Sequence, residues 1–393
     1  MLTLNQVPNL LRRSLWLIAC ASATAQAGLS AVVAVEPTAK KATYNIYFSA
    51  LDSALSRAAA QPVAASASED LADVMRATRS AGFDIFIGPA QVAASALHRG
   101  YELVGASQAS EPYLLVVRKD FADIPALKTR RIYLPQQDSI YTYMARGLLN
   151  QGGLSMQDMK VQHERFPQAG LTALLLGAAD ATVVTAGDWA EWSALNPTVG
   201  RVLAKTDPVP AGLSVVIKKD LPADVRARLS AWFAAPPAGV GLPPTKFKPE
   251  AGEYKRVSEL GLFTPTALPG VTRVSARDAQ KLQAQGALLI DTRTEKEFAA
   301  RHIPGAVWAA YAEKSLKDIA FNAAQDDFSA LGKIDKLDTN RALIFACNGA
   351  ECWKSYKAAR VALQKGFKKV YWLRGGLPEW EAEGLPVQQN AAP

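Results

Sequence analysis

Cysteine and histidine are scarce in this chain, which has three of each among 393 residues. Three cysteines are too few for a disulfide scaffold. The histidines, His98, His163 and His302, lie far apart and lack the spacing of zinc ligands. The sequence therefore predicts neither a disulfide-stapled fold nor a metal site. It also has no glycine-rich phosphate loop that would indicate a nucleotide cofactor, so no cofactor is expected.

Blocks of like charge are absent as well. The formal net charge is +8 and the isoelectric point is about 9.3, but the 44 lysines and arginines are interspersed with 36 acidic residues. Scattered charge of this kind leaves no basic footprint for nucleic acid, so we expect no such partner. We interpret the positive excess as a source of solubility and of attraction for small anions.

Long hydrophobic runs are missing too, although a membrane-spanning helix needs about 20 apolar residues. Near the start, two arginines at 12–13 precede a short apolar run over 15–20, and a small-x-small pattern follows at 25–27. This order is typical of a cleaved signal peptide. We therefore expect residues 1–27 to be removed and the mature chain to begin at Gly28 in the periplasm, without stable membrane insertion.

Two other interpretations of the first residues are open. Cys20 ends a lipoprotein-like stretch and would then carry a lipid, but the apolar segment before it is short for that purpose. Retention of the same run as a membrane anchor is the other alternative, and its serine, threonine and glutamine content disfavours it.

The length of the chain fits two domains of ordinary size. Between residues 40 and 235, short β-like runs alternate with helical patterns, which is typical of sheets covered by helices. Strands are expected over 44–48, 83–87, 114–117, 131–134, 181–184 and 213–217, and helices over 69–80, 141–150, 171–176 and 223–233. A stretch rich in proline and glycine then predicts a linker over 236–269, followed by a second domain over 270–388.

The order of features in the first domain resembles the periplasmic substrate-binding proteins of phosphonate and phosphite uptake. Four passages carry this resemblance, over 83–90, 114–120, 131–139 and 173–181. The resemblance implies an α/β fold of two lobes. It also implies a ligand-binding site formed by Gly88, Pro89, Asp138, Ser139 and Asp188.

Asp138 and Ser139 lie at a predicted strand-to-helix junction, where unpaired N–H groups and the helix dipole favour an anion. Ser139 would donate its hydroxyl to such a ligand, or one of the two side chains would only cap the helix. The histidine of the resembled family is absent, with 166–168 in its place, and its acid is displaced to Asp188. A small oxyanion is therefore expected as ligand, but phosphonate is not specified.

The C-terminal part contains a series of motifs in a fixed order. An apolar strand ends in Asp291 and Arg293, a Glu-Phe and His-Ile-Pro-Gly-Ala passage follows over 297–306, and a second apolar strand ends in Cys347. A closing passage spans 366–380. This order resembles the rhodanese-like sulfurtransferases and implies a domain with a central parallel sheet.

The resemblance implies that Cys347 is the nucleophile, and thiol chemistry supports that role. Only a thiolate attacks a sulfane sulfur or a disulfide, and an ordinary thiol is mostly protonated at neutral pH. The loop that follows leads into a predicted helix, so N–H groups and a helix N-terminus converge on the sulfur. Its expected members are Asn348, Gly349, Ala350, Glu351, Cys352, Trp353 and Lys354. The alternative is a buried and inert cysteine.

Charged residues near the loop are expected to have opposite effects on the ionisation of Cys347. Lys354 would favour the thiolate, whereas Glu351 would disfavour it if its side chain pointed inward. Asp291 and Arg293 lie at the carboxyl end of a strand, where α/β sheets place their sites, and are expected to support the loop. His302 belongs to the motif before the Pro-Gly turn, so we expect it to be structural.

Cys352 is a second thiol five positions after the first. It would resolve a persulfide on Cys347, close a disulfide within the loop, or only fill space. The function expected from all this is a periplasmic rhodanese-like protein that handles sulfane sulfur through a Cys347 persulfide. Its partners would be a small sulfur donor or thiol acceptor and a small oxyanion. The alternative is a solute-binding protein whose rhodanese-like domain is inactive or senses thiol redox state.

Overall fold

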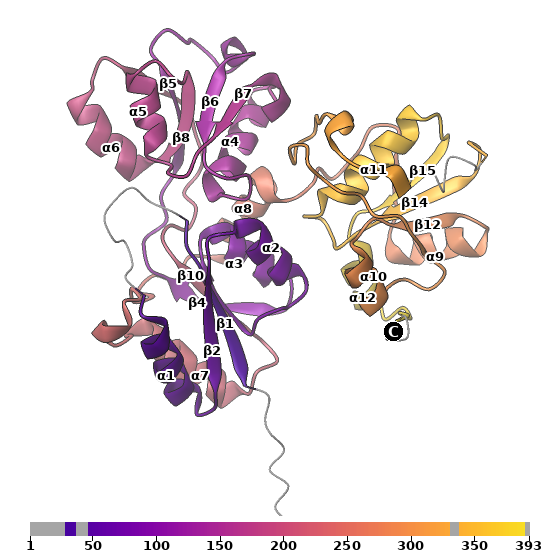
Figure 1. The fold of residues 1–393 in the computed structure, drawn as a ribbon, viewed down its shortest axis with the longest axis horizontal. Coiled ribbons are helices and arrows are strands. Elements are labelled where there is room, and N and C mark those ends of the chain that lie inside the picture. The colour runs from indigo at the N-terminus through magenta and orange to yellow at the C-terminus, as the bar shows by residue number, and fades with distance from the viewer. Residues whose placement is uncertain (1–27, 37–45, 331–337, 390–393) are drawn as a thin grey trace, which may run out of the picture.

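The computed structural model describes residues 28–36, 46–330 and 338–389. These residues form three five-stranded sheets, two in the first part of the chain and one in the last. Figure 1 shows the first two sheets as separate lobes, one above the other, with the C-terminal domain beside them. The expected signal peptide lies outside the described residues.

The first lobe contains a sheet of strand order β2-β1-β3-β10-β4. Its strands are β1 (Leu29–Ala34), β2 (Val63–Ser68), β3 (Ile85–Gly88), β4 (Tyr101–Ala106) and β10 (Ser214–Lys218). The pairs among β1, β2 and β3 are parallel, and β10 runs antiparallel to β3 and β4. Its helices are α1 (Phe48–Ala59), α2 (Leu71–Arg79), α3 (Ala90–Leu97) and α7 (Ala223–Ala234).

The prediction of a strand over 44–48 is wrong. Residues 44–45 lie outside the described part, and α1 begins at Phe48. The run has β propensity, but the residues after it bury Leu51, Ala54 and Leu55 at helical spacing against the lobe core. The strand that pairs here is β1, which lies before the domain start expected at residue 40.

The second lobe contains a sheet of strand order β7-β6-β8-β5-β9. Its strands are β5 (Tyr113–Arg118), β6 (Arg131–Leu134), β7 (Lys160–His163), β8 (Ala181–Thr185) and β9 (Gly200–Lys205), and its helices are α4 (Ile140–Gln151), α5 (Ala169–Leu175) and α6 (Ala186–Leu195). The chain crosses between the lobes over 107–112 and again over 206–213. A cavity between the lobes lies beside these crossings.

The expected linker over 236–269 contains helical structure. Helix α8 (Ala251–Val257) packs on α3, and a π-helical segment, η4 (Ser258–Leu262), packs on α4. Gly261 allows this approach, because a Cβ atom there would lie 2.2 Å from the carbonyl oxygen of Tyr143. The segment therefore packs against both lobes before the chain enters the C-terminal domain.

The C-terminal domain is a parallel sheet of order β11-β15-β14-β12-β13. Its strands are β11 (Thr272–Arg273), β12 (Leu288–Asp291), β13 (Val307–Trp308), β14 (Ala342–Ala346) and β15 (Lys369–Leu373), and its helices are α9 (Ala276–Ala284), α10 (Glu295–Ala300), α11 (Trp353–Gln364) and α12 (Gly376–Ala382). In β14, Leu343 and Phe345 face the core under α11, whereas Ile344 and Ala346 face the core under α9 and α12. The predicted α/β fold with a two-lobed first domain and a central parallel sheet is confirmed.

The C-terminal domain docks against both lobes of the first domain. Arg99, just after α3 in the first lobe, makes an ion pair with Glu351, and Lys317 binds Asp138 of the second lobe at 2.6 Å. Asp318 accepts a hydrogen bond of 2.6 Å from the backbone N–H of Met156. Within the described residues, no helix is both long and apolar enough to cross a membrane.

Candidate functional site

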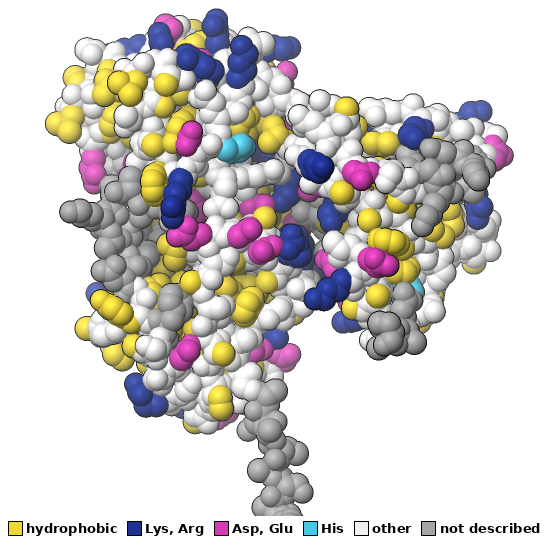
Figure 2. Space-filling model, in the orientation of Figure 1, with side chains coloured by type: hydrophobic (Ala, Val, Ile, Leu, Met, Phe, Trp, Pro, Cys, Tyr) yellow, Lys and Arg dark blue, Asp and Glu magenta, His cyan; other side chains and the backbone are white. Residues whose placement is uncertain are grey.

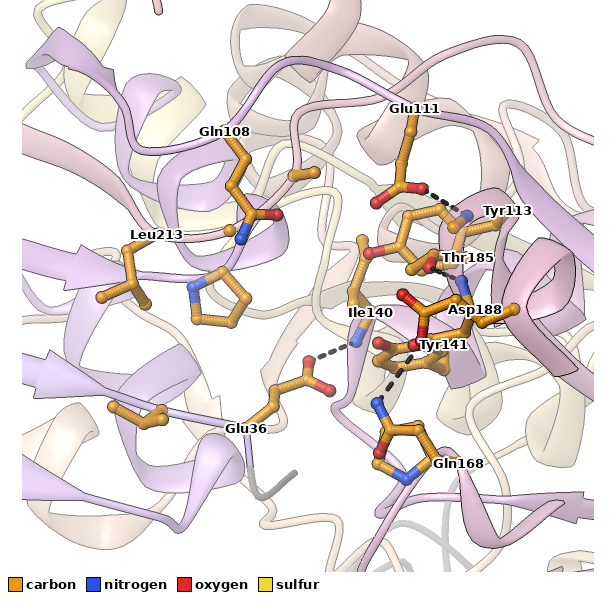
Figure 3. A pocket seen from close by; sticks show the side chains of 17 residues that line it. Glu36, Gln108, Glu111, Tyr113, Ile140, Tyr141, Gln168, Thr185, Asp188 and Leu213 are labelled. Carbon is orange, nitrogen blue, oxygen red and sulfur yellow. Dashed lines mark hydrogen bonds between the residues drawn. The ribbon is translucent and has the colours of Figure 1, made fainter. Parts of the chain in front are cut away.

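A cavity of about 260 Å³ lies between the two lobes of the first domain. Figure 3 shows side chains from both lobes pointing into it. Its polar lining includes Glu36, Gln108, Glu111, Gln168, Asp188 and Glu191, with the rings of Tyr113 and Tyr141 on the second-lobe side. No lysine or arginine is among the described residues that line this cavity.

The N-terminus of α4 opens at this cavity, and a carboxylate of the chain already occupies it. Ser139 caps the helix by accepting a hydrogen bond from the N–H of Tyr141. Glu36 accepts a 2.6 Å hydrogen bond from the Ser139 hydroxyl and a 2.7 Å bond from the N–H of Ile140. Gln91 donates a further bond to Glu36. The Ser139 hydroxyl and the N–H at the start of α4, which were expected to bind an oxyanion, therefore donate hydrogen bonds to Glu36 in this structure.

Burial raises the pKa of Glu36 above its ordinary value, although the hydrogen bonds from Ser139, Ile140 and Gln91 oppose this rise. Burial likewise raises the pKa of Tyr113 and Tyr141, and the nearby carboxylates add to that effect. Both phenols thus stay protonated at neutral pH and present hydroxyl groups to the cavity.

The five residues predicted to bind the first domain's ligand do not all reach the cavity. Pro89 and Asp188 line it, and Ser139 lies next to the lining residue Ile140. Gly88 is buried in β3, where a Cβ atom would lie 3.1 Å from that of Ala34, so it serves close packing. Sequence reasoning missed Glu36 and Glu111, because nothing local distinguishes these acids from surface ones.

Asp138 faces the C-terminal domain instead of the cavity. Both of its carboxylate oxygens bind Lys317, at 2.6 and 2.9 Å, and the hydroxyl of Tyr143 also donates to it. Burial alone would raise the pKa of Asp138, but Lys317 and Tyr143 hold it below its ordinary value. Its observed role is a charged contact between domains.

The cysteine loop follows β14 in the C-terminal domain. Cys347 and Cys352 are joined by a disulfide, and they are only 2% and 8% exposed. Cys352 is the N-cap residue of α11 and makes no side-chain cap hydrogen bond, so the first N–H groups of that helix have no partner in the side chain of their N-cap residue. Gly376 lets α12 approach, because a Cβ atom there would lie 2.0 Å from the Cys347 carbonyl oxygen.

Asp291 and Arg293 form a buried ion pair beside this loop, with Nη2 of Arg293 2.7 Å from Oδ2 of Asp291. Arg293 also donates to the side-chain oxygen of Asn348 at 3.5 Å. On its other side, Asn348 donates to Glu297 at 2.6 Å. The pair predicted to support the loop therefore contacts it through Asn348.

Positive side chains lie along the junction between the domains on the face shown in Figure 2. Burial lowers the pKa of Lys354 below its ordinary value, and Arg76 and Arg79 of α2 add to this effect, whereas Glu297 opposes it. The ring of Trp353 lies 5.5 Å from the guanidinium of Arg146 in the second lobe.

A second cavity, of about 280 Å³, opens beside the loop at the domain junction. Its walls combine first-domain and C-terminal residues, among them His98, Arg99, Gly349, Glu351, Pro378 and Glu379. Sequence reasoning missed His98 and Arg99, which lie about 250 positions before the loop and carry no motif. Among the described residues, no group of three His, Cys, Asp or Glu side chains is placed to hold a metal ion.

Comparison with family models gives two matches that together span most of the described chain. Residues 33–236 match the model described as "ABC transporter, phosphonate, periplasmic substrate-binding protein". Residues 275–383 match the model of the rhodanese-like domain.

Curated relatives match about 30% of the chain. The chain is 30% identical over 110 residues to the thiosulfate sulfurtransferase GlpE of Pseudomonas savastanoi pv. phaseolicola, which covers 28% of this chain and 87% of that protein. It is also 30% identical over 146 residues to rhodanese-like domain-containing protein 14, chloroplastic, of Arabidopsis thaliana. That match covers 30% of this chain and 65% of the Arabidopsis protein.

Solved structures match a larger share of the chain. PhnD1 of Prochlorococcus marinus, in complex with methylphosphonate, is 16% identical with a TM-score of 0.45, over 59% of this chain and 96% of that one. XAC2383 of Xanthomonas citri, bound to ATP, is 15% identical with a TM-score of 0.46, over the same shares of the two chains.

Proposed function

Because the chain belongs to the family of periplasmic substrate-binding proteins of phosphonate ABC transporters and carries a rhodanese-like domain, we propose that it is a periplasmic sulfur-handling protein. In this proposal Cys347 carries sulfane sulfur as a persulfide, and the first domain binds a small oxyanion. The periplasmic location is inferred from the family, together with the expected cleavage before Gly28. N-terminal sequencing of the secreted protein would find Gly28 first if that inference holds.

The observation that supports the proposal is the placement of Cys347. Cys347 directly follows the carboxyl end of the buried parallel strand β14. The loop that starts at this cysteine ends at the N-terminus of α11, which has no side-chain cap. Partial positive charge at such a helix end favours a thiolate over a thiol. Related proteins that cover this domain include enzymes named thiosulfate sulfurtransferases.

The proposed reaction begins with reduction of the Cys347–Cys352 disulfide by a dithiol, which supplies two electrons. The Cys347 thiolate then attacks the sulfane sulfur of a donor such as thiosulfate, the S–S bond of the donor breaks, and sulfite leaves with the bonding electrons. An acceptor thiolate next takes the outer sulfur and restores the Cys347 thiolate. Alternatively, the Cys352 thiolate attacks the inner sulfur, hydrosulfide leaves, and the disulfide forms again.

Replacing Cys352 with serine tests this route. We expect the variant to need no reductant and to hold a persulfide on Cys347 after thiosulfate treatment, because the attacking thiol has been removed. Hydrosulfide release should fall by about tenfold or more. Intact mass spectrometry detects the added sulfur atom, and a hydrosulfide electrode follows the turnover.

The reduced parent protein is the control for that experiment. Unchanged hydrosulfide release in Cys352→Ser would assign Cys352 a packing role. If neither protein gains sulfur, the second candidate function applies: a solute-binding protein whose cysteine pair senses redox state. The closed disulfide and the 2% exposure of Cys347 favour that candidate.

For the first domain we propose an oxyanion subsite at the N-terminus of α4, supported by the phosphonate-type family. The Glu36 carboxylate already accepts hydrogen bonds from these donors, the Ser139 hydroxyl and the Ile140 N–H. An oxyanion therefore has to displace this carboxylate. Replacing Glu36 with alanine should therefore tighten methylphosphonate binding by about tenfold, which corresponds to roughly 1.4 kcal/mol. Replacing Ser139 with alanine should weaken binding, because a donor is lost.

Isothermal titration calorimetry at neutral pH measures both effects, and Glu164→Ala, at an exposed site away from the cavity, is the matched control. Affinity that does not respond to Glu36→Ala would place the ligand elsewhere.

A further inference from the structure

Glu351 is a negative charge within the loop that carries the proposed thiolate. It lies one position before Cys352, and its side chain is 1% exposed. A buried carboxylate disfavours a second negative charge nearby, and it is costly unless a cation or hydrogen-bond donors compensate it. The sequence left open how the loop tolerates this residue.

The compensating groups come from the first domain. Nη2 of Arg99 lies 2.7 Å from Oε1 of Glu351, and the Ser95 hydroxyl donates to Oε2 at 2.7 Å. The same Nη2 donates to the backbone carbonyl of Asn348. Arg99 is itself only 11% exposed in its side chain. Both ends of the segment between the two cysteines are thus held by one guanidinium.

We propose that Arg99 is a positioning residue of the rhodanese site, so that the substrate-binding domain completes the site by neutralising Glu351 and holding the cysteine loop. This inference rests on the proposed thiolate chemistry of Cys347. It adds that the C-terminal domain alone has an unbalanced acid in its reactive loop. The two domains then form one functional unit.

The other charged groups that face the loop are already engaged or make no ion pair with Glu351. Arg293 is paired with Asp291, Arg374 donates to the carbonyl oxygens of residues 264 and 265, and Glu379 accepts from the N–H of Ala276. Lys354 makes no ion pair with Glu351 among the described residues, and the carboxylates that raise its pKa are Glu297 and Glu313. Among the described residues, Arg99 is the cation in an ion pair with Glu351.

His98 makes its own contacts away from Glu351, with its Nε2 atom 3.3 Å from the hydroxyl oxygen of Ser258. Burial lowers the pKa of His98 below its ordinary value, and Arg99 adds to this effect, while Glu351 opposes it. The ring instead lies 4.8 Å from Phe263. Besides Arg99, Ser95 is the first-domain residue that donates a hydrogen bond to Glu351 among the described residues.

Helix α3 connects this contact to the ligand cavity. Pro89, its N-cap residue, lines the cavity, and Gln91 in its first turn donates to Glu36. Ser95 lies in its last turn, and Arg99 follows its end. The side chains that complete the cysteine loop are thus carried by a helix that begins in the ligand cleft.

The test is the pH dependence of Cys347 alkylation by iodoacetamide in the full-length protein, with Cys352→Ser as the common background. Mass spectrometry of the loop peptide reports the rate at this thiol alone. Arg99→Ala should raise the pH midpoint by about one unit and slow alkylation about tenfold at neutral pH, because Glu351 loses its counter-charge. Arg99→Lys should restore part of the rate.

The double variant Arg99→Ala with Glu351→Gln separates charge from fold. If the charge of Glu351 is the cause, the double variant returns to the low midpoint, whereas a collapsed loop would keep the high one. Arg118→Ala, which removes a partly exposed arginine of the same domain, should leave the midpoint unchanged. An unchanged midpoint in Arg99→Ala, or no recovery in the double variant, overturns the inference.

The outcome for the proposed function is read separately. Alkylation needs no sulfur donor. If the Cys352→Ser protein with Arg99 intact shows the pH midpoint of an ordinary cysteine, the result contradicts the proposed thiolate itself. A low midpoint in the parent that Arg99→Ala does not move contradicts only the role of Arg99.

Discussion

Replacing Cys347 with serine is expected to abolish sulfur transfer from thiosulfate, with a loss on the order of a thousandfold or more. A serine hydroxyl stays protonated at neutral pH and cannot attack the sulfane sulfur, whatever the loop does to favour an anion. The measurement is sulfite release by the reduced full-length protein, together with intact mass for the persulfide. No sulfur should be retained by the variant.

The substitution should leave the fold intact, because serine is nearly the same size as cysteine. Hydrogen exchange of the peptides that contain β14 and α11 checks this point. Cys352→Ser is the matched control, since it also breaks the disulfide but keeps the nucleophile. If Cys347→Ser transferred sulfur as fast as the parent, the nucleophile assignment would be wrong, and the domain would have to be interpreted as a binding module.

Replacing Arg293 with alanine is expected to destabilise the C-terminal domain by about 3–5 kcal/mol, because it leaves a buried carboxylate without its counter-ion. The side chains of Arg293 and Asp291 are each 4% exposed. Asp291 would keep no guanidinium, and the loop would lose the contact from Arg293 to Asn348. Urea-dependent hydrogen exchange of β12 and β14 peptides measures the domain separately from the two lobes.

Arg277→Ala is the control for that variant. Arg277 pairs with Glu383 at 2.7 Å in the same domain, but the two side chains are 62% and 44% exposed. Exposed pairs of this kind contribute about 0–1 kcal/mol, so the control should stay close to the parent. Equal losses in both variants would show that burial of the Asp291–Arg293 pair does not determine its contribution.

The helices and strands that the sequence predicted best are those in which apolar, buried residues form a clear local pattern. Strand β6 was predicted with its observed bounds, since an apolar run between polar flanks specifies a buried strand whatever surrounds it. The run over 44–48 misled for the converse reason. Its residues favour a strand, but the buried spacing of Leu51, Ala54 and Leu55 places the following residues in α1.

The candidate site residues likewise fall into those that local sequence predicts and those whose contacts depend on tertiary packing. Cys347 and its loop lie within eight consecutive residues, so their chemistry can be read locally, and the same holds for the cap formed by Ser139. Asp138 was expected at the ligand site because it adjoins that cap. It turns instead to Lys317, since the direction of a side chain at a helix start depends on what packs against it.

The sequence by itself determined the two families and the order of the domains, and it predicted Cys347 as the nucleophile and the start of α4 as a source of N–H donors for an anion. Each of these depends on residues close together along the chain, where strand ends, caps and loop lengths are set locally. Only the tertiary structure decided that Glu36 occupies that helix start and that Arg99 reaches Glu351. These partners are about 100 and 250 positions apart in the chain. Only the packing of separate elements brings them together, and a carboxylate buried without such a partner would be costly.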